Sequence, residues 1–271
     1  MSQLPAWSDA FASDQVPNLP ALPLEDAREW AFGGSTGAGV SVAIVDSGVD
    51  AGHPAVGGVA SAVAMEADDT RDEKYRAVEG PHEDLVGHGT ACAAIIRSLA
   101  PDVELHSIRV LGPNLKGKGL LFHAGLTWVV EHGYAAANLS LSSKSDAMFG
   151  PLHDIADRAY FSRSLLVCAA NNQPGPTYPS QFASVLSVAC EPGDDPWMLT
   201  CNPNPPVEFG ARGIDMEVAW TDGGTIVATG NSFAAPHVTA MAALILAKHP
   251  GLTPYQVKAV LQAVSNNAAS D

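Results

Sequence analysis

An apolar run near the C-terminal end of the chain constrains the fold most strongly. Residues 238–248, Val-Thr-Ala-Met-Ala-Ala-Leu-Ile-Leu-Ala-Lys, carry no charge before the final lysine. A helix that is apolar on every side has to be buried, because no face of it suits water. The chain has 271 residues, enough to enclose such a helix in one large α/β domain. The run is shorter than the ~20 residues that a membrane-spanning helix needs, so we expect no membrane partner.

The segment that leads into this run reads as the start of the helix. It is Gly-Asn-Ser-Phe-Ala-Ala-Pro-His, residues 230–237. Pro236 suits the beginning of a helix, where its missing N–H removes no intrahelical bond, and Gly230 lets another backbone approach closely. Ser232 is therefore expected at the helix N-terminus. Its hydroxyl is either a simple N-cap or a nucleophile, whose oxyanion the free N–H groups and the helix dipole would stabilise.

Two other segments place a carboxylate and an imidazole at comparable junctions. An apolar strand over residues 42–45 ends at Asp46 in an Asp-Ser-Gly turn, and Gly-His-Gly-Thr around His88 leads into an apolar helix. Each motif alone is also typical of an ordinary turn or loop. The carboxyl ends of the strands of an open α/β sheet meet at one edge, where such folds bind ligands. We therefore expect Asp46, His88 and Ser232 to converge.

Together the three motifs resemble those of the subtilases, the serine proteases that include subtilisin and proteinase K. The resemblance runs from about Gly37 to Ala263. It implies a doubly wound, mostly parallel sheet with helices on both faces, which the alternation of strands and helices also indicates. It implies a single peptidase domain over residues 37–271, preceded by an N-terminal arm over residues 1–36. It further implies an Asp-His-Ser triad in the order known for subtilisin.

The expected activity is that of a serine endopeptidase that acts on a peptide or protein substrate, without a metal or other cofactor. One alternative is an acyl-transfer enzyme that passes the acyl group to an amine and so cyclises or joins peptides with the same triad. A second alternative is a binding module that kept the cleft but not turnover. The mass of the product distinguishes hydrolysis from acyl transfer, because only hydrolysis adds one water. An activated serine would exclude the binding module.

The resemblance places the oxyanion donor after the strand over residues 165–170. The family has Ala-Ala-Gly-Asn there, which makes Asn172 the donor and puts Asn171 in the place of glycine. Asparagine tolerates the left-handed backbone better than most residues. A one-residue slip would make Asn171 the donor, so both alternatives stay open. Asn231 stands where the family has threonine before the nucleophile, so one supporting hydrogen bond is expected to differ.

The resemblance also implies a set of substrate-binding residues. The Gly-rich edge before residue 120 would pair with an extended substrate backbone, unless it is only a helix entry. Residues 135–142 resemble the Asn-x-Ser-Leu-Gly strand that walls the first specificity pocket. Ser142 and Thr177 replace two family glycines, which predicts a shortened pocket that disfavours large aromatic side chains. The expected substrate-binding residues are Lys118, Gly119, Ser140, Leu141, Ser142 and Thr177.

The charge of the chain bears on its partners. It has 29 acidic and 14 basic residues, a net charge of −15, which argues against nucleic acid or an anionic membrane. Residues 65–84 are the most acidic stretch. They form either a solvated loop, or a loop whose carboxylates, at Glu79, Glu83 or Asp84, border the cleft and favour basic substrates.

The cysteines and the N-terminal stretch bear on location. The chain has four cysteines, Cys92, Cys168, Cys190 and Cys201, without metal-ligand spacing. Buried, reduced thiols are expected, with a Cys190–Cys201 bridge left open, and Cys92 lies one helical turn after His88. Residues 1–16 lack the basic start and apolar run of a signal peptide. These features predict a cytoplasmic processing enzyme.

Two segments that many subtilases carry are not expected here. The residues before Gly37 are too few for the usual folded pro-domain, with residues 17–23 forming an extended arm. The chain is therefore expected to fold unaided or with a separate precursor or inhibitor partner. The stretch between Ile96 and Val103 lacks the calcium-binding insertion of many secreted subtilases, which predicts stability without calcium.

Overall fold

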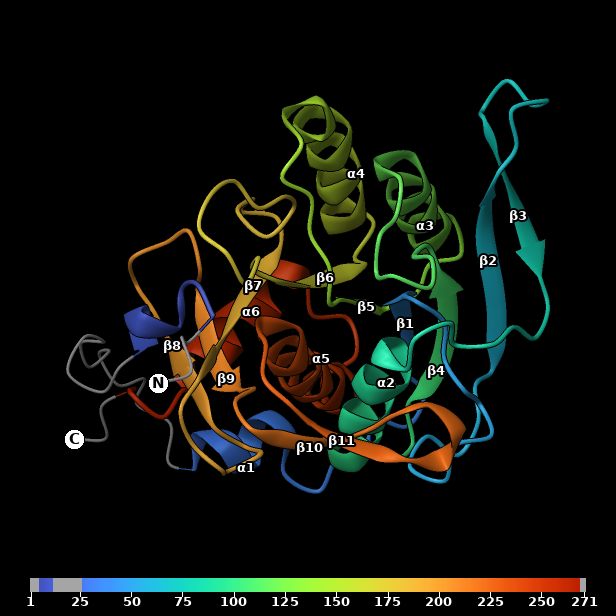
Figure 1. Ribbon diagram of the computed structural model, residues 1–271. Coiled ribbons are helices and arrows are strands. Elements are labelled where there is room, and N and C mark those ends of the chain that lie inside the picture. Colours follow the sequence, from blue (N-terminus) through green and yellow to red (C-terminus); the bar gives the residue numbers. More distant parts are fainter. Residues whose placement is uncertain (1–4, 12–25, 269–271) are drawn as a thin grey trace.

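The computed structural model describes residues 5–11 and 26–268, which form layers of helices on a central sheet (Figure 1). The strands of this sheet are β1 Ser41–Asp46, β2 Ser61–Ala67, β3 Tyr75–Glu79, β4 Glu104–Arg109, β5 Ala136–Leu139, β6 Leu165–Ala169, β7 Leu186–Glu191, β8 Leu199–Cys201 and β9 Phe209–Arg212. The helices are α1 Ala27–Phe32, α2 His88–Leu99, α3 Gly119–Glu131, α4 Phe149–Phe161, α5 Asn231–Lys248 and α6 Pro254–Ala263. A separate antiparallel pair consists of β10 Met216–Ala219 and β11 Thr225–Ala228.

The main sheet has nine strands in the order β3-β2-β4-β1-β5-β6-β7-β9-β8. All neighbours are parallel except the two edge strands, β3 and β8, which pair antiparallel. Strand β1 lies between β4 and β5, and its last residue, Asp46, is in register with Arg109 of β4. The predicted doubly wound, mostly parallel sheet is confirmed.

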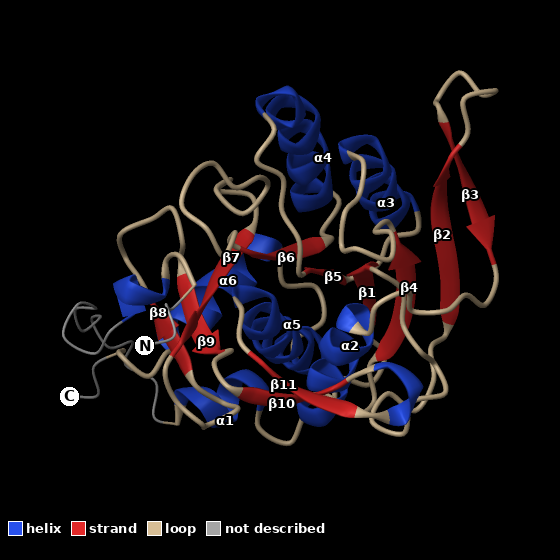
Figure 2. Ribbon diagram, viewed as in Figure 1, coloured by secondary structure: helices blue, strands red, loops and turns tan. Residues whose placement is uncertain are grey.

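Helices cover both faces of this sheet. In β1, Val42 and Ile44 face a core formed with α1, α2, α5 and α6, whereas Ala43 and Val45 face a core formed with α3 and α4. This alternation follows from the two-residue period of a strand. Figure 2 shows α3 and α4 above the sheet, with α2 and α5 below it. Both faces of β1 are apolar, which explains the continuous apolar run in its sequence.

The apolar run near the C-terminal end forms most of α5, as expected. Every residue from Phe233 to Ile245 is buried. The helix packs against strands β5, β6, β7 and β9 and against α2. Because α5 begins at Asn231, Pro236 lies at its sixth residue rather than at its first turn. The expected position of Pro236 was therefore wrong, and its missing N–H leaves the Ser232 carbonyl without an intrahelical donor.

Two segments differ from expectation, and one lies outside the described residues. Residues 26–36 were assigned to an arm, but they include α1, which packs on α5 with Ala31 in the core. The acidic stretch is a hairpin of β2 and β3 that projects from the edge of the sheet, rather than a loop (Figure 1). The expected arm over residues 17–23 lies outside the described residues. Helix α6 begins at Pro254, as its sequence predicted.

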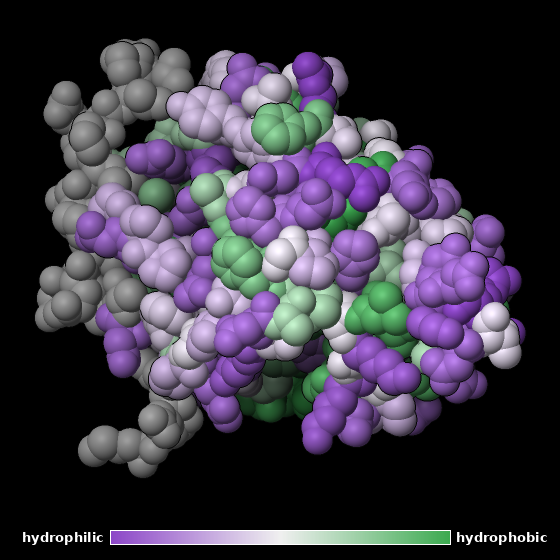
Figure 3. All heavy atoms as spheres, turned by 90° about the horizontal axis from the view of Figure 1, so that it is seen from above, coloured by the Kyte–Doolittle hydropathy of each residue, from purple (hydrophilic) through white to green (hydrophobic). Residues whose placement is uncertain are grey.

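The surface carries mostly polar side chains. Seen from the side of α3 and α4, hydrophilic residues dominate, and apolar ones form small separate patches (Figure 3). Within residues 5–11 and 26–268, no helix is both long and apolar enough to cross a lipid bilayer.

Candidate active site

Strand β1 delivers Asp46 to the carboxyl edge of the sheet, where the side chain is completely buried. The turn that follows lies against the start of α2. A Cβ on Gly89 would lie 1.9 Å from the Gly48 carbonyl oxygen, so only glycine permits this approach. The close contact brings the first residue of α2, His88, over the carboxylate.

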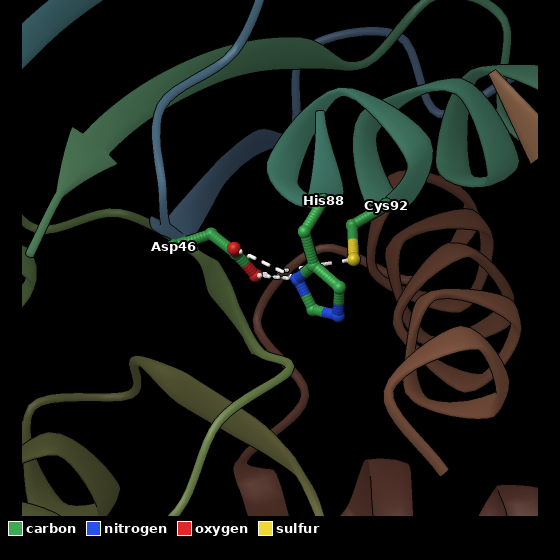
Figure 4. A group of neighbouring side chains, drawn as sticks. All are labelled: Asp46, His88 and Cys92. Atoms are coloured by element: carbon green, nitrogen blue, oxygen red, sulfur yellow. Dashed lines mark hydrogen bonds and ion pairs between the residues drawn. The ribbon is translucent and has the colours of Figure 1, made fainter. Parts of the chain in front are cut away.

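Asp46 binds the His88 ring through one nitrogen. His88 Nδ1 lies 2.8 Å from Oδ1 and 3.0 Å from Oδ2 of Asp46, and the two side chains face each other in Figure 4. A proton held on Nδ1 by the carboxylate leaves Nε2 free to accept one. Burial opposes a charge on the ring, but the charge and hydrogen bond of Asp46 outweigh it. The net effect raises the pKa of His88.

Asp84 fixes the start of α2, a role that the sequence did not reveal. Its two carboxylate oxygens accept hydrogen bonds from five donors: Ser47 Oγ, the backbone N–H groups of Val86, Gly87 and Thr90, and Thr90 Oγ1. Burial opposes the charge of Asp84, but these hydrogen bonds outweigh it and lower the pKa of the carboxyl group. Asp84 is thus a buried anion at a helix N-terminus, not a substrate-facing carboxylate.

Ser232 is the second residue of α5, and Gly230 is the N-cap. The alternative in which Ser232 is the N-cap is therefore wrong. A Cβ on Gly230 would lie 3.2 Å from Ser232 Oγ, so glycine leaves room for the hydroxyl. The Ser232 carbonyl, freed by Pro236, accepts a hydrogen bond of 2.7 Å from Ser140 Oγ. Ser140 thus supports the backbone of the predicted nucleophile from the neighbouring strand end.

The side-chain amides of Asn171 and Asn172, the two candidates for the oxyanion donor, differ in their hydrogen bonds. Asn172 Oδ1 accepts a hydrogen bond of 2.9 Å from the Asn231 N–H, which orients its Nδ2 away from that contact. Asn171 Oδ1 instead accepts from the N–H of Gln173 in a local turn. Within the described residues, Asn172 Nδ2 and the Ser232 N–H have no hydrogen-bond partner. Both are free to bind an oxyanion.

The Asn231 side chain, in the position of the expected threonine, is completely buried. Its Oδ1 accepts from the Cys190 N–H at 3.0 Å, and its Nδ2 donates to the carbonyls of Ala6 at 3.0 Å and Ala170 at 3.1 Å. The supporting hydrogen bond that was expected to differ is thus replaced by a network that joins β7, the strand end at Ala170 and residue 6.

His88 and Ser232 line one cavity of about 310 Å³. Within the described residues, no hydrogen bond joins Ser232 Oγ to the ring, a separation common in ligand-free enzymes. The other lining residues are Leu111, Leu115, Ser140, Leu141, Ser142, Ala169, Ala170, Asn171, Asn172 and Gln173. Leu111 and Leu115 are residues that the sequence analysis missed, since a single leucine in a loop carries no motif.

Three of the expected substrate-binding residues lie elsewhere. Lys118 is the N-cap of α3, and it lines a separate cavity of about 510 Å³. Gly119 starts α3 against Met148, where an added Cβ would lie 2.5 Å from the sulfur. Thr177 is completely buried, and its Oγ1 accepts a hydrogen bond from the Asn171 N–H. Gly119 thus allows α3 to pack closely on Met148, and its pairing with substrate stays a prediction, whereas Thr177 supports the amide turn.

The acidic side chains also lie outside this cavity. Glu79 is exposed on β3, and Glu83 lines a third cavity together with Asp50 and His82. Since Asp84 is buried at the start of α2, no carboxylate of the acidic stretch lies among the residues lining the His88 cavity. Of the two alternatives for this stretch, the one in which its carboxylates border the site therefore finds no support in the lining of this cavity.

Cys92 is a buried thiol beneath the site. Its sulfur lies 4.0 Å from Asp46 Oδ2 (Figure 4). It also lies 3.2 Å from Ser140 Oγ. Asp46, His88 and Cys92 offer ligand atoms within 4.8 Å of one another, but burial and the charge of Asp46 raise the pKa of the thiol. A metal needs the thiolate, so the group suits a metal poorly.

The four cysteines form no disulfide within residues 5–11 and 26–268. Cys190 lies on β7 and Cys201 on β8, and β9 separates these strands in the sheet. The open question of a Cys190–Cys201 bridge is thereby answered, and all four thiols are buried as expected.

Comparisons with known proteins agree with this architecture. A family model described as the Subtilase family matches residues 37–271. Subtilisin DY from Bacillus licheniformis is 30% identical over 264 residues, covering 91% of this chain and 90% of that protein. Subtilisin E from Bacillus subtilis (strain 168) is 30% identical over 250 residues, covering 86% of this chain and 62% of that protein, less than two thirds of its length.

A solved structure supports the same relationship. The crystal structure of a cold adapted subtilisin-like serine proteinase matches with a TM-score of 0.69 and 26% identity, covering 93% of this chain and 91% of that one. The family match spans most of the chain and includes all three motifs. The chain therefore belongs to the subtilase family and is a subtilisin-like serine peptidase, a hydrolase.

Proposed function

We propose that the protein hydrolyses peptide bonds through a triad of Asp46, His88 and Ser232. The observation that carries this proposal is the pair of short contacts from Asp46 to His88 Nδ1, with His88 and Ser232 lining the same cavity. A neutral serine is a poor nucleophile, so it needs a base within reach and a group that orients the base. His88 supplies the base, and Asp46 supplies the group that orients it.

The proposed reaction begins when His88 Nε2 accepts the proton of Ser232 Oγ as the oxygen attacks the peptide carbonyl. Asp46 stabilises the imidazolium that results, in line with the raised pKa of His88. The oxyanion binds the free Ser232 N–H and Asn172 Nδ2, and His88 then donates its proton to the leaving amine. Water repeats the sequence on the acyl-enzyme and releases the acid product.

The lining of the cavity suggests the substrate class. Its walls include three leucines and small polar residues, and apart from His88 no lining residue carries a titratable side chain. We infer that the site takes small or medium uncharged side chains on the acyl side of the cut. The preference for basic substrates, which would need carboxylates in this cavity, finds no support in its lining.

We also infer that the enzyme acts inside the cell on a peptide or protein precursor. Four buried, unpaired cysteines support a reducing compartment, where disulfides are rare. The net charge of −15 supports a substrate that is neither nucleic acid nor an anionic membrane surface.

A fluorophosphonate probe tests the mechanism, because labelling requires an activated serine that displaces fluoride from phosphorus. We expect one label per chain in the wild type and none in Ser232→Ala, with unchanged melting temperature. Ser140→Thr, which keeps a hydroxyl beside Ser232, is the matched control and should still label. A fully labelled Ser232→Ala variant would show that the nucleophile lies elsewhere. Product mass then distinguishes hydrolysis from transfer, because hydrolysis adds one water across the cut bond.

A further inference from the structure

Residues 5–11 lie against the back of the proposed oxyanion site. The Ala6 N–H donates to the Asn172 carbonyl at 2.8 Å, and the Ala6 carbonyl accepts from Asn231 Nδ2 at 3.0 Å. Asn172 carries the free amide, and Asn231 precedes Ser232. One residue near the start of the chain thus binds both the backbone of Asn172 and the side chain of Asn231.

This segment is anchored to the sheet. Phe11 is 4% exposed and packs with Ala170, Ala189 and Val207. Ser8 Oγ lies 3.0 Å from Cys190 Sγ on β7. In Figure 1 the short helix of residues 8–11 lies at the β7-β9-β8 end of the sheet, apart from α3 and α4. Gly210 makes the contact possible, since a Cβ there would lie 2.4 Å from the Phe11 ring.

The buried Asn231 amide depends on this docking. Its Nδ2 donates to the Ala6 and Ala170 carbonyls, while Asn171 O is a third, longer contact at 3.4 Å. Without Ala6, one Nδ2 proton loses its shortest partner inside the protein, which costs the desolvation of a buried donor. The Asn231 N–H holds Asn172 Oδ1, so a shift of Asn231 moves the Asn172 amide as well.

We propose that residues 5–11 are a positioning element of the catalytic site, which holds the Asn172 amide in its oxyanion-binding orientation through Ala6 and Asn231. This inference rests on the proposed role of Asn172. The segment touches no substrate. Its docking stabilises the transition state, because the oxyanion forms only there, so undocking lowers kcat and leaves KM nearly unchanged.

The test is a double-mutant cycle between the segment and the amide. Phe11→Ala removes the anchor, and Ala6→Pro removes the N–H that binds the Asn172 carbonyl but keeps the anchor. One lost oxyanion donor costs about 100-fold or more in kcat, and a displaced donor costs part of that. We expect each segment variant to lower kcat about tenfold with little change in KM. Asp9→Asn, exposed on the same segment, is the matched control and should match the wild type.

The Asn172→Ala background separates positioning from general destabilisation. There, Phe11→Ala should change kcat by less than about twofold, since the donor that the segment positions is already gone. A full tenfold loss in both backgrounds would overturn the proposal, as would wild-type kcat in Phe11→Ala and Ala6→Pro. If Asn172→Ala itself kept the wild-type kcat, the proposed oxyanion donor would be wrong. Melting temperatures of all variants identify any loss due to unfolding, and the assay is run well below the lowest of them.

Discussion

At the scale of single residues, two buried carboxylates set the protonation of His88. Asp46 contacts the ring directly, and the charge of Asp84 adds to its effect from the start of α2. Catalysis needs neutral His88, so activity falls as the pH drops through its pKa. Since that pKa is raised, we expect the acidic limb of kcat/KM at a pH above the ordinary imidazole value of about 6.5.

Asp84→Asn should move this limb to lower pH, because it removes a negative charge that favours the imidazolium. The measurement is the pH dependence of kcat/KM for the wild type and the variant, with melting curves to confirm folding. Glu83→Gln removes the same charge from an exposed neighbour and serves as the control, with no expected movement. An Asp84→Asn limb at the wild-type position would show that Asp84 acts on the helix alone.

The residues of the site were only partly predictable from the sequence. Asp46, His88 and Ser232 each lie in a motif with its own turn chemistry, and the structure brings them to one edge of the sheet, although their roles stay predictions until variants are assayed. Ser140 and Asp84 were missed as supports. Ser140 binds a carbonyl 92 residues away along the chain, and such a contact leaves no local pattern. Asp84 looked like one more charge in an acidic run.

At the scale of elements, the start of α5 depends on a hydrogen bond from outside the helix. Pro236 cannot donate to the Ser232 carbonyl, and Ser140 Oγ takes that role. We expect Ser140→Ala to lower the free energy of unfolding by about 1–3 kcal/mol, because it leaves a part-buried carbonyl without this donor. Urea denaturation measures the change.

Pro236→Ala provides a specific rescue, because it supplies an N–H four residues after Ser232. In the Ser140→Ala, Pro236→Ala double variant, the loss should be smaller than in Ser140→Ala alone. Ser142→Ala, on the same segment, is the control for a serine whose hydroxyl does not support α5. Equal losses in the double variant and in Ser140→Ala would mean that the helix start gains nothing from a donor at this carbonyl.

The elements were easier to predict than their pairing. The all-round apolar sequence of α5 requires burial, and the runs of β1 and β6 require cover on both faces. The β2–β3 hairpin was missed because its charges, typical of an exposed edge strand, suggested a loop. Lys118 and Gly119 lie at the start of α3, a boundary that a Gly-Lys-Gly pattern does not fix, and their pairing with substrate stays a prediction.

At the scale of the whole molecule, an arginine near the end of α2 binds carbonyl groups of two other backbone segments. Arg97 donates to the carbonyls of Val56 at 3.0 Å, Pro101 at 2.7 Å and Val103 at 2.8 Å. The guanidinium thus supplies a fixed positive charge among carbonyl oxygens. We expect the same melting temperature with a chelator as with millimolar calcium, because this region is held by a covalently attached cation.

Calorimetry of the wild type with and without chelator measures this directly, and a fall of many degrees with chelator would contradict it. Arg97→Ala should lower the melting temperature in both buffers. A loss of about 2 kcal/mol corresponds to about 4–8 °C for a domain of this size. Arg163→Ala, which removes a single hydrogen bond to the Gly251 carbonyl, is the control and should cost less.

The burial of α5 has a consequence for the order in which the molecule opens. Backbone amides in the middle of this helix have protein on every side, so solvent deuterium reaches them only when the entire domain unfolds. Strand β3 is largely exposed at the edge of the sheet, and its amides should exchange through local opening. Mass spectrometry of exchange in low urea should therefore show β3 labelled long before α5, in molecules that still cleave peptide. The helix that carries the proposed nucleophile is thus expected to unfold last. Proteolytic cleavage of the β2–β3 hairpin should leave a working enzyme.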